Sequence, residues 1–160
     1  CYMLSMLAPE RVVCGLDYDE DKISLANHCF LRKANISFLH ADMVTCQMPQ
    51  SDVFLFNDSL HYVCEASQKI VLEHCLENLN PGGMLIVRDG DATNDNEQRH
   101  IEETEVWSTK IIGFNKTVEE LTFLTKDWMK DFANEHNLEI KIKKCDEKTS
   151  ETLYILRRKR

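Results

Sequence analysis

The stretch VVCGLDYDEDKISLANHCF, residues 12–30, decides the fold of this chain. It begins with Val12–Leu16, an apolar run of the kind found in strands that are covered on both faces. The run ends in Asp17, and the acidic segment that follows suits the first turn of a helix. Beyond it, apolar residues recur at the spacing of one helical face: Ile23, Ala26 and Phe30. The stretch therefore predicts a buried strand, a polar turn and a helix that begins near Asp19.

The same alternation of apolar runs and helical periodicity continues along the chain. Three further runs predict strands: Ile36–His40, Val53–Phe56 and Met84–Val87. Helices are predicted by the spacing of Leu72, Cys75, Leu76 and Leu79, which Asn80–Gly83 should terminate, and near Asp127–His136. Strands that alternate with helices are typical of an α/β fold, in which helices cover both faces of a parallel sheet.

Length, composition and charge restrict the class of protein. With 160 residues, 43% of them hydrophobic, and no linker-like stretch, residues 1–160 are predicted to form one domain. The net charge of -8 argues against a nucleic-acid partner, because phosphate backbones are bound by clustered Lys and Arg. The basic run Arg157–Arg160 is typical of a solvated terminus. Because no apolar stretch is long enough to span a bilayer, we expect no membrane contact and a cytoplasmic location.

The seven cysteines show no CxxC spacing and indicate neither a disulfide framework nor a metal site. Most have apolar neighbours in the sequence, so we expect reduced cysteines that serve as small core residues. They are Cys1, Cys14, Cys29, Cys46, Cys64, Cys75 and Cys145.

Each predicted strand ends in polar residues: Asp17, then His40–Asp42, then Asn57–Asp58, then Arg88–Asp89. Ligands bind open parallel sheets in the crevice at the carboxyl ends of the strands, so these side chains should converge on one rim. An aspartate at such a place can accept hydrogen bonds from both hydroxyls of a ribose. The alternative for Asp17 is that it only caps the helix that follows.

Four segments resemble, in order and spacing, those that follow the glycine-rich loop of class I S-adenosylmethionine-dependent methyltransferases. They are VVCGLDYDEDKISLA, HADM, DVFLFNDSLHYV and LNPGGMLIVRDGD, and they cover residues 10–91. The resemblance implies a three-layer Rossmann-like sheet that is mostly parallel. The stretches Leu138–Cys145 and Leu153–Leu156 resemble the antiparallel strand pair that closes the sheet in this family.

The resemblance also implies roles for residues that would hold the adenosine half of S-adenosylmethionine. Asp17 matches the acid that holds the ribose hydroxyls, and Asp42 matches the acid that accepts from the adenine amino group. Tyr18 and Met43 match side chains that lie against the adenine ring. For these two residues ordinary packing is an equal alternative.

At the methionine half of the cofactor, the resemblance places Asn57 and Asp58 near the transferred methyl group. His61 is the best candidate for a general base, because imidazole titrates near neutral pH and this loop should face the crevice. A structural histidine is an equally good interpretation. Tyr62 could line the acceptor site. The Pro-Pro-Tyr or Pro-Pro-Phe signature of amino-group methylation on DNA or protein is absent at 57–60, which favours a small-molecule acceptor.

Residues 94–125 fit no core element, and in this family a substrate-covering insertion often occupies the corresponding position. Its aromatic residues would then wall an acceptor pocket, or else belong to the core of an extra helix. They are Trp107, Phe114 and Phe123.

The chain departs from the family pattern at its start. None of its five glycines forms a GxGxG loop before Val12, and Cys1–Leu7 resembles the helix that should follow that loop. We therefore expect an N-terminally truncated domain from the C-terminal part of a longer protein. Loss of the first strand would leave exposed strand edges through which the chain could form a homo-oligomer.

Two alternative functions remain open from the sequence. One is a catalytically inactive methyltransferase-like binding domain. The other is an NAD(P)-dependent Rossmann oxidoreductase, which would also place an acid at a strand end and whose Tyr/Lys spacing is present at Tyr18 and Lys22.

Overall fold

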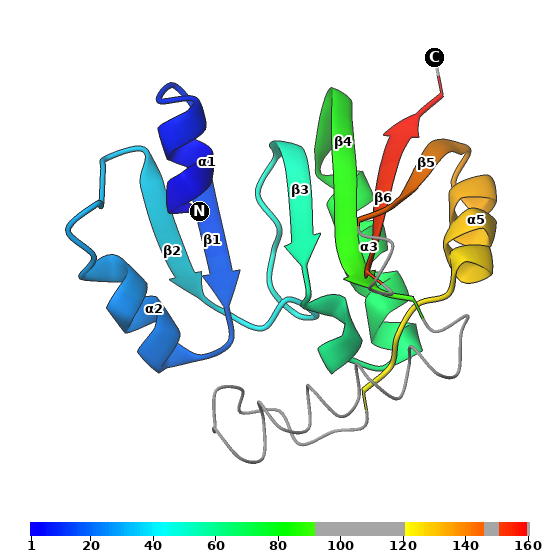
Figure 1. Ribbon diagram of the computed structural model, residues 1–160, viewed down its shortest axis with the longest axis horizontal. Helices are drawn as coiled ribbons and strands as arrows, with labels where there is room; N and C mark the ends of the chain where they lie inside the picture. Colours follow the sequence, from blue (N-terminus) through cyan, green and yellow to red (C-terminus); the bar gives the residue numbers. More distant parts are fainter. Residues whose placement is uncertain (92–120, 146–150, 160) are drawn as a thin grey trace. The chain divides into compact units, whose positions relative to one another are not determined.

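The computed structural model describes residues 1–91, 121–145 and 151–159, which form an α/β structure. The chain divides into two compact units, Cys1–Gln47 and Met48–Arg160. In the described part of the chain each unit contains one sheet (Figure 1).

The first unit is a pair of parallel strands with two helices. Its elements are α1 (Tyr2–Leu7), β1 (Val13–Asp17), α2 (Glu20–Asn27) and β2 (Ile36–His40). The register pairs Val13 with Ile36 and Asp17 with His40, so both strands end at the same level. A parallel pair of this kind confirms the strand–helix–strand pattern that residues 12–40 predict.

Tyr2 joins the elements of the first unit. Its hydroxyl donates to the carbonyl of Ala26 in α2 at 2.7 Å, and its ring centroid lies 5.5 Å from that of Phe38 in β2. Gly15 allows β1 to lie close to these groups, because a Cβ at this position would be 2.8 Å from the Phe38 ring and 2.7 Å from the Cys1 sulfur. The sequence therefore needs a glycine in the middle of this strand.

Helix α2 is shorter than the apolar spacing predicts. It ends at Asn27, because the backbone of His28 has left the helical region and the next residues turn. Ile23 is buried, but Phe30 is 93% exposed and is not part of the helix. The prediction that Phe30 shares a helical face with Ile23 was wrong.

The second unit is a four-stranded mixed sheet with two α-helices in the described residues. Its elements are β3 (Ser51–Asn57), the short 3₁₀ helix η1 (Leu60–Tyr62), α3 (Glu65–Glu77), β4 (Leu79–Gly90), α5 (Lys126–Glu135), β5 (Leu138–Lys144) and β6 (Glu151–Arg158). The strand order is β3-β4-β6-β5, in which β3 and β4 are parallel and the pairs β4/β6 and β5/β6 are antiparallel. This order confirms the antiparallel strand pair at the end of the sheet.

One face of this sheet carries the core. Leu85 and Val87 of β4 lie opposite Leu156 and Tyr154 of β6, and all four side chains are fully buried. Helix α3 packs on β4 and α5 packs on β5, and each contributes buried side chains. These include Val71, Leu72 and Cys75 from α3 and Met129 and Phe132 from α5. Each large side chain buried in this way stabilises the fold by about 1.5–3 kcal/mol.

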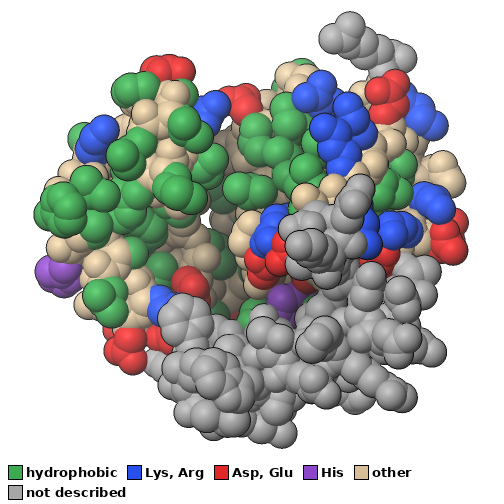
Figure 2. Space-filling model, in the orientation of Figure 1, with side chains coloured by type: hydrophobic (Ala, Val, Ile, Leu, Met, Phe, Trp, Pro, Cys, Tyr) green, Lys and Arg blue, Asp and Glu red, His purple; other side chains and the backbone are tan. Residues whose placement is uncertain are grey.

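The opposite face of the sheet is also apolar over β3 and β4, but its side chains are more exposed to solvent than those of the core face. Val53 and Leu55 are 46% and 47% exposed, and their partners Met84 and Ile86 are half-buried. Figure 2 shows hydrophobic side chains gathered over these two strands. The outer strand β5 differs, because it presents the exposed lysines Lys141, Lys143 and Lys144.

Each sheet of the described residues has two edge strands, β1 and β2 in the first unit and β3 and β5 in the second. Within the described ranges, β1 pairs only with β2, and β3 pairs only with β4. Each of these strands therefore has one edge whose backbone groups pair with no described strand.

Strand β4 begins earlier than predicted. Residues 80–83 were expected to end the preceding helix as a turn, and Leu79 was assigned to that helix. Instead Leu79 pairs with Ser51, and an irregularity in register follows before Val53 meets Met84. Gly82 has a φ of +80°, and a Cβ on Gly83 would lie 2.7 Å from the Asp52 carbonyl oxygen, so glycines permit a bulge within the strand.

None of the seven cysteines forms a disulfide, and only Cys75 is buried. The prediction that most cysteines serve as core residues was therefore wrong, because five of the other six lie outside helices and strands, in turns or at the ends of elements. No helix in the described part of the chain is long and apolar enough to cross a membrane.

Candidate functional site

Asp17 ends β1 and is held in place by the turn that follows. Its Oδ1 accepts from the amide of Asp19 at 2.9 Å, and the side chain is half-buried. Asp19 is the N-cap residue of α2, because its own Oδ1 accepts from the Asp21 amide at 3.0 Å. Asp17 therefore does not cap the helix, and its carboxylate lies at the end of the strand in a fixed orientation.

The other candidates for the adenosine half lie at the same ends of the two paired strands. The Ala41 amide donates to the Asp17 carbonyl at 3.0 Å, which brings the residues after β2 beside the end of β1. Asp42 is exposed, and its Oδ1 accepts from the Val44 amide at 2.8 Å. Tyr18 is 60% exposed and Met43 is half-buried. The first unit thus brings together all four residues that the sequence assigns to adenosine.

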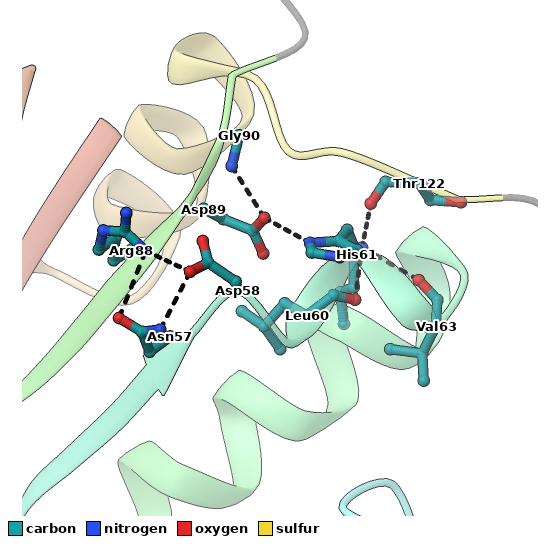
Figure 3. A network of polar contacts seen from close by, with 10 residues as sticks. Asn57, Asp58, Leu60, His61, Val63, Arg88, Asp89, Gly90 and Thr122 are labelled. Atoms are coloured by element: carbon teal, nitrogen blue, oxygen red, sulfur yellow. Dashed lines mark hydrogen bonds and ion pairs between the residues drawn. The ribbon is translucent and has the colours of Figure 1, made fainter. Parts of the chain in front are cut away.

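Asn57 and Asp58 lie at the end of β3 in a charged network of the second unit (Figure 3). The Asn57 side-chain amide donates to Asp58 Oδ2 at 3.0 Å, and Arg88 forms ion pairs with Asp58 and with Glu151. Asp58 has a φ of 51°, and its amide donates to the Arg88 carbonyl at 2.9 Å. Burial raises the pKa of Asp58, although the Arg88 charge acts in the opposite direction.

His61 forms a buried pair with Asp89, which lies near the end of β4. The distance from His61 Nδ1 to Asp89 Oδ1 is 2.6 Å, and each side chain is 2% exposed. The same Oδ1 accepts from the Gly90 amide at 2.8 Å, as Figure 3 shows. The other ring nitrogen of His61, Nε2, is buried and has no hydrogen-bond partner among the described residues. The structure therefore places His61 in η1, shortly after the end of β3, with its side chain enclosed rather than open to solvent.

Aromatic rings and the segment before α5 enclose the His61 ring. The ring centroids of Tyr62 and Phe123 lie 4.2 Å and 4.8 Å from that of His61. The Thr122 amide donates to the His61 carbonyl at 3.0 Å. Phe123 is the only one of the three predicted pocket aromatics that can be placed, because Trp107 and Phe114 lie outside the described residues.

Gln68 of α3 links η1 to the segment before α5 through hydrogen bonds. Its fully buried side-chain amide donates to the carbonyls of Leu60 and Val63, both at 3.0 Å, and to that of Thr122 at 2.5 Å. Leu60 precedes His61 in the chain and Val63 follows it, whereas Thr122 belongs to the segment that covers His61. Gln68 therefore fixes the position of η1 relative to residues 121–124.

Sequence reasoning missed the roles of Asp89 and Gln68. Asp89 had been noted only as a polar strand end, and nothing in the sequence pairs it with His61. Gln68 gave a clearer signal, since it is a polar residue four positions before Leu72 on the apolar face of the predicted helix.

A second cluster of ionisable groups lies between α3 and α5. Single ligand atoms of Glu73, Glu135 and His136 lie within 4.8 Å of one another. The Lys69 ammonium already lies 2.8 Å from Glu135 and 4.0 Å from Glu73, so ion pairs account for this cluster.

Comparison with protein-family models matches residues 1–155 to the family described as "Methyltransferase domain". The chain belongs to this family. The class I methyltransferase resemblance of residues 10–91 is thereby confirmed, and the match extends over the strands that follow. No curated protein matches the chain in sequence.

Solved methyltransferase structures have the same fold as this methyltransferase domain. Human N-acetylserotonin methyltransferase in complex with S-adenosylmethionine gives a TM-score of 0.66 at 17% identity, over 96% of this chain and 42% of that one. An O-methyltransferase family protein from Burkholderia thailandensis gives 0.72 at 18% identity, over 98% and 46%. An O-methyltransferase family 2 protein from Planctomyces limnophilus in complex with apigenin gives 0.67 at 16% identity, over 97% and 45%. The domain spans less than half the length of each.

Proposed function

We propose that this domain takes part in methyl transfer from S-adenosylmethionine to a small-molecule acceptor, with His61 as the general base. The observation that carries the proposal is the His61–Asp89 pair at the strand ends, with a buried imidazole nitrogen that has no described partner. A histidine held in this way can accept a proton. The family assignment supports methyl transfer over hydride transfer to NAD(P).

The residues of the first unit suit the adenosine half of this cofactor. Asp17 and Asp42 are both oriented by backbone amides and stand at the ends of adjacent strands. In our proposal Asp17 accepts from the ribose hydroxyls and Asp42 from the adenine amino group, while Tyr18 and Met43 lie against the ring. When bound, the cofactor supplies a methyl group on a positively charged sulfur.

Residues of the second unit are assigned to the reacting end. Asn57 and Asp58 are held rigidly by Arg88, and we propose that they act near the methionine portion. Tyr62, next to the base, would line the acceptor site. Two of the solved structures with this fold support an acceptor of small-molecule size. One is N-acetylserotonin methyltransferase, and the other is an O-methyltransferase in complex with apigenin.

The state of the cysteines and the net charge support proposals about location and partners. Seven cysteines without a disulfide favour a reducing compartment, so we propose a cytoplasmic location. The negative net charge supports the absence of a nucleic-acid partner.

Thermal-shift and calorimetric titrations test the proposal. S-adenosylhomocysteine should stabilise the protein, whereas NAD and NADP should not. Stabilisation by a dinucleotide alone would replace methyl transfer with the oxidoreductase function. Binding of S-adenosylhomocysteine without turnover on any acceptor would indicate an inactive binding domain.

A further inference from the structure

His40, the last residue of β2, joins the ends of β1 and β2 through its side chain. The strand register pairs His40 with Asp17, the last residue of β1. The Nε2 atom of the His40 ring lies 2.9 Å from the carbonyl oxygen of Tyr18, the residue after Asp17. A carbonyl oxygen can only accept a hydrogen bond, so Nε2 must be the ring nitrogen that bears hydrogen. His40 therefore donates to Tyr18.

This hydrogen bond continues the contact between the two strands beyond their backbone pairing. The Ala41 amide donates to the Asp17 carbonyl at 3.0 Å, and the chain then turns toward α2, whose N-cap residue is Asp19. Tyr18 lies within this turn. The His40 ring reaches the Tyr18 carbonyl from β2, so a side chain takes the place of a backbone donor at this point.

The position of Tyr18 depends on this bond, because packing does little to fix a residue that is 60% exposed. The turn is also held by Asp17 Oδ1, which accepts from the Asp19 amide at 2.9 Å. That bond lies within the turn and does not join β1 to β2, whereas the bond from His40 does. His40 therefore sets where Tyr18 lies relative to the residues that follow β2.

We infer that His40 is a positioning residue for adenosine binding: it holds Tyr18 in place relative to Asp42 and Met43. The inference rests on the proposed function, in which these three residues bind the adenine. A ligand that contacts both strand ends binds more tightly when the ends are already in position, because less conformational freedom is lost on binding. His40 acts through the Tyr18 backbone, without contact with the ligand.

Calorimetric titration of the full chain with adenosine and with S-adenosylhomocysteine tests this role. His40→Leu removes the donor and should weaken the binding of both ligands by about 3- to 10-fold, the range expected for the loss of one hydrogen bond. The two factors should be equal, because both ligands carry the same adenosine. His40→Gln should restore the wild-type affinity to within about 2-fold, since a glutamine amide can donate from nearly the same position as Nε2.

His28→Leu is the matched control for this titration. His28 Nδ1 lies 2.7 Å from the Ser24 carbonyl oxygen, so this ring also contacts a backbone carbonyl of the first unit. His28 is the C-cap residue of α2, at the other end of the helix from Tyr18, and its replacement should leave both affinities unchanged. Wild-type affinities of His40→Leu would overturn the inference, as would a His40→Gln protein that binds as weakly as His40→Leu.

Nitrogen-15 NMR of histidine-labelled protein tests the hydrogen bond without any ligand. At mildly alkaline pH the signal of His40, assigned by its loss in His40→Gln, should show hydrogen on Nε2 and a bare Nδ1 in the wild type. Hydrogen on Nδ1 would overturn the assignment, even if the variants do not fold. Failure of the proposed function is seen separately, because the wild-type protein would then bind neither adenosine nor S-adenosylhomocysteine, and the inference would fall with it.

Discussion

Replacement of Gln68 by Leu should destabilise the second unit strongly, because one buried amide serves three backbone carbonyls. In Gln68→Leu, the Leu60 carbonyl keeps a bond from the Val63 amide at 3.1 Å. The carbonyls of Val63 and Thr122 lose the donor that the structure gives them. A buried acceptor left without a partner costs about 1–3 kcal/mol, and the lower half of this range applies to these two part-buried carbonyls.

The expected net loss is smaller than the sum of these costs. Leucine buries extra apolar surface and removes Gln68 Oε1, an oxygen without a hydrogen-bond partner among the described residues. We therefore expect Gln68→Leu to lower the free energy of unfolding by about 1–3 kcal/mol. At this chain length the loss corresponds to a fall in Tm of roughly 2–12 °C.

Urea denaturation followed by circular dichroism measures this change. The same substitution at an exposed position, Gln50→Leu, is the matched control and should alter stability by less than about 0.5 kcal/mol. If the Gln68→Leu protein is as stable as this control, the three hydrogen bonds do not stabilise the position of η1 relative to residues 121–124.

Three further predictions concern the proposed site. Asp17→Ala should weaken S-adenosylhomocysteine binding by about 1–3 kcal/mol in calorimetry, because the ribose hydroxyls lose an acceptor. The control variant Asp21→Ala should bind with wild-type affinity. Equal affinities of the two variants would show that Asp17 does not belong to the site. His61→Ala should lower turnover about 10²-fold or more while cofactor affinity is retained, and wild-type turnover across the pH range would mean that the histidine is structural. Arg88→Leu should raise the pKa of Asp58 further, since Arg88 has the largest lowering effect of the groups around it. Because a carboxyl with a raised pKa holds its proton longer in the folded state, the stability of this variant should fall as pH rises through that pKa. An NMR titration of Asp58 that shows no upward change would contradict the ion pair's role.

The strands of this fold could be predicted because each is a run of apolar residues followed by polar ones, but their burial was overestimated: no residue of β1 is buried, and Val53 and Leu55 of β3 are 46% and 47% exposed. The prediction of Ile36–His40 agrees with β2 at both ends. The start of β4 could not be predicted, since residues 80–83 have the composition of a turn. Only the pairing of Leu79 with Ser51 shows that these glycines form a bulge within a strand.

The residues of the site could be predicted better than their interactions. The strand-end rule depends on local sequence and led to Asp17 as a candidate, whereas His61 was proposed from the chemistry of imidazole and its place in the loop after the strand. The partner of His61 lies 28 residues away and is brought near by the register that pairs Asn57 with Arg88. Register between parallel strands depends on packing that a single sequence does not reveal.

The edges of the four-stranded sheet set a limit on how copies of this unit can assemble. One edge, β5, presents Lys141, Lys143 and Lys144, whose like charges repel a second copy. The other edge, β3, carries the exposed Val53 and Leu55 and pairs with no described strand on its outer side. If this sheet is considered alone, one available edge allows a single neighbour, so we expect association through β3 to stop at a two-fold dimer. We expect the lysines of β5 to prevent growth into a fibre through this sheet, because a fibre needs a binding surface at both edges.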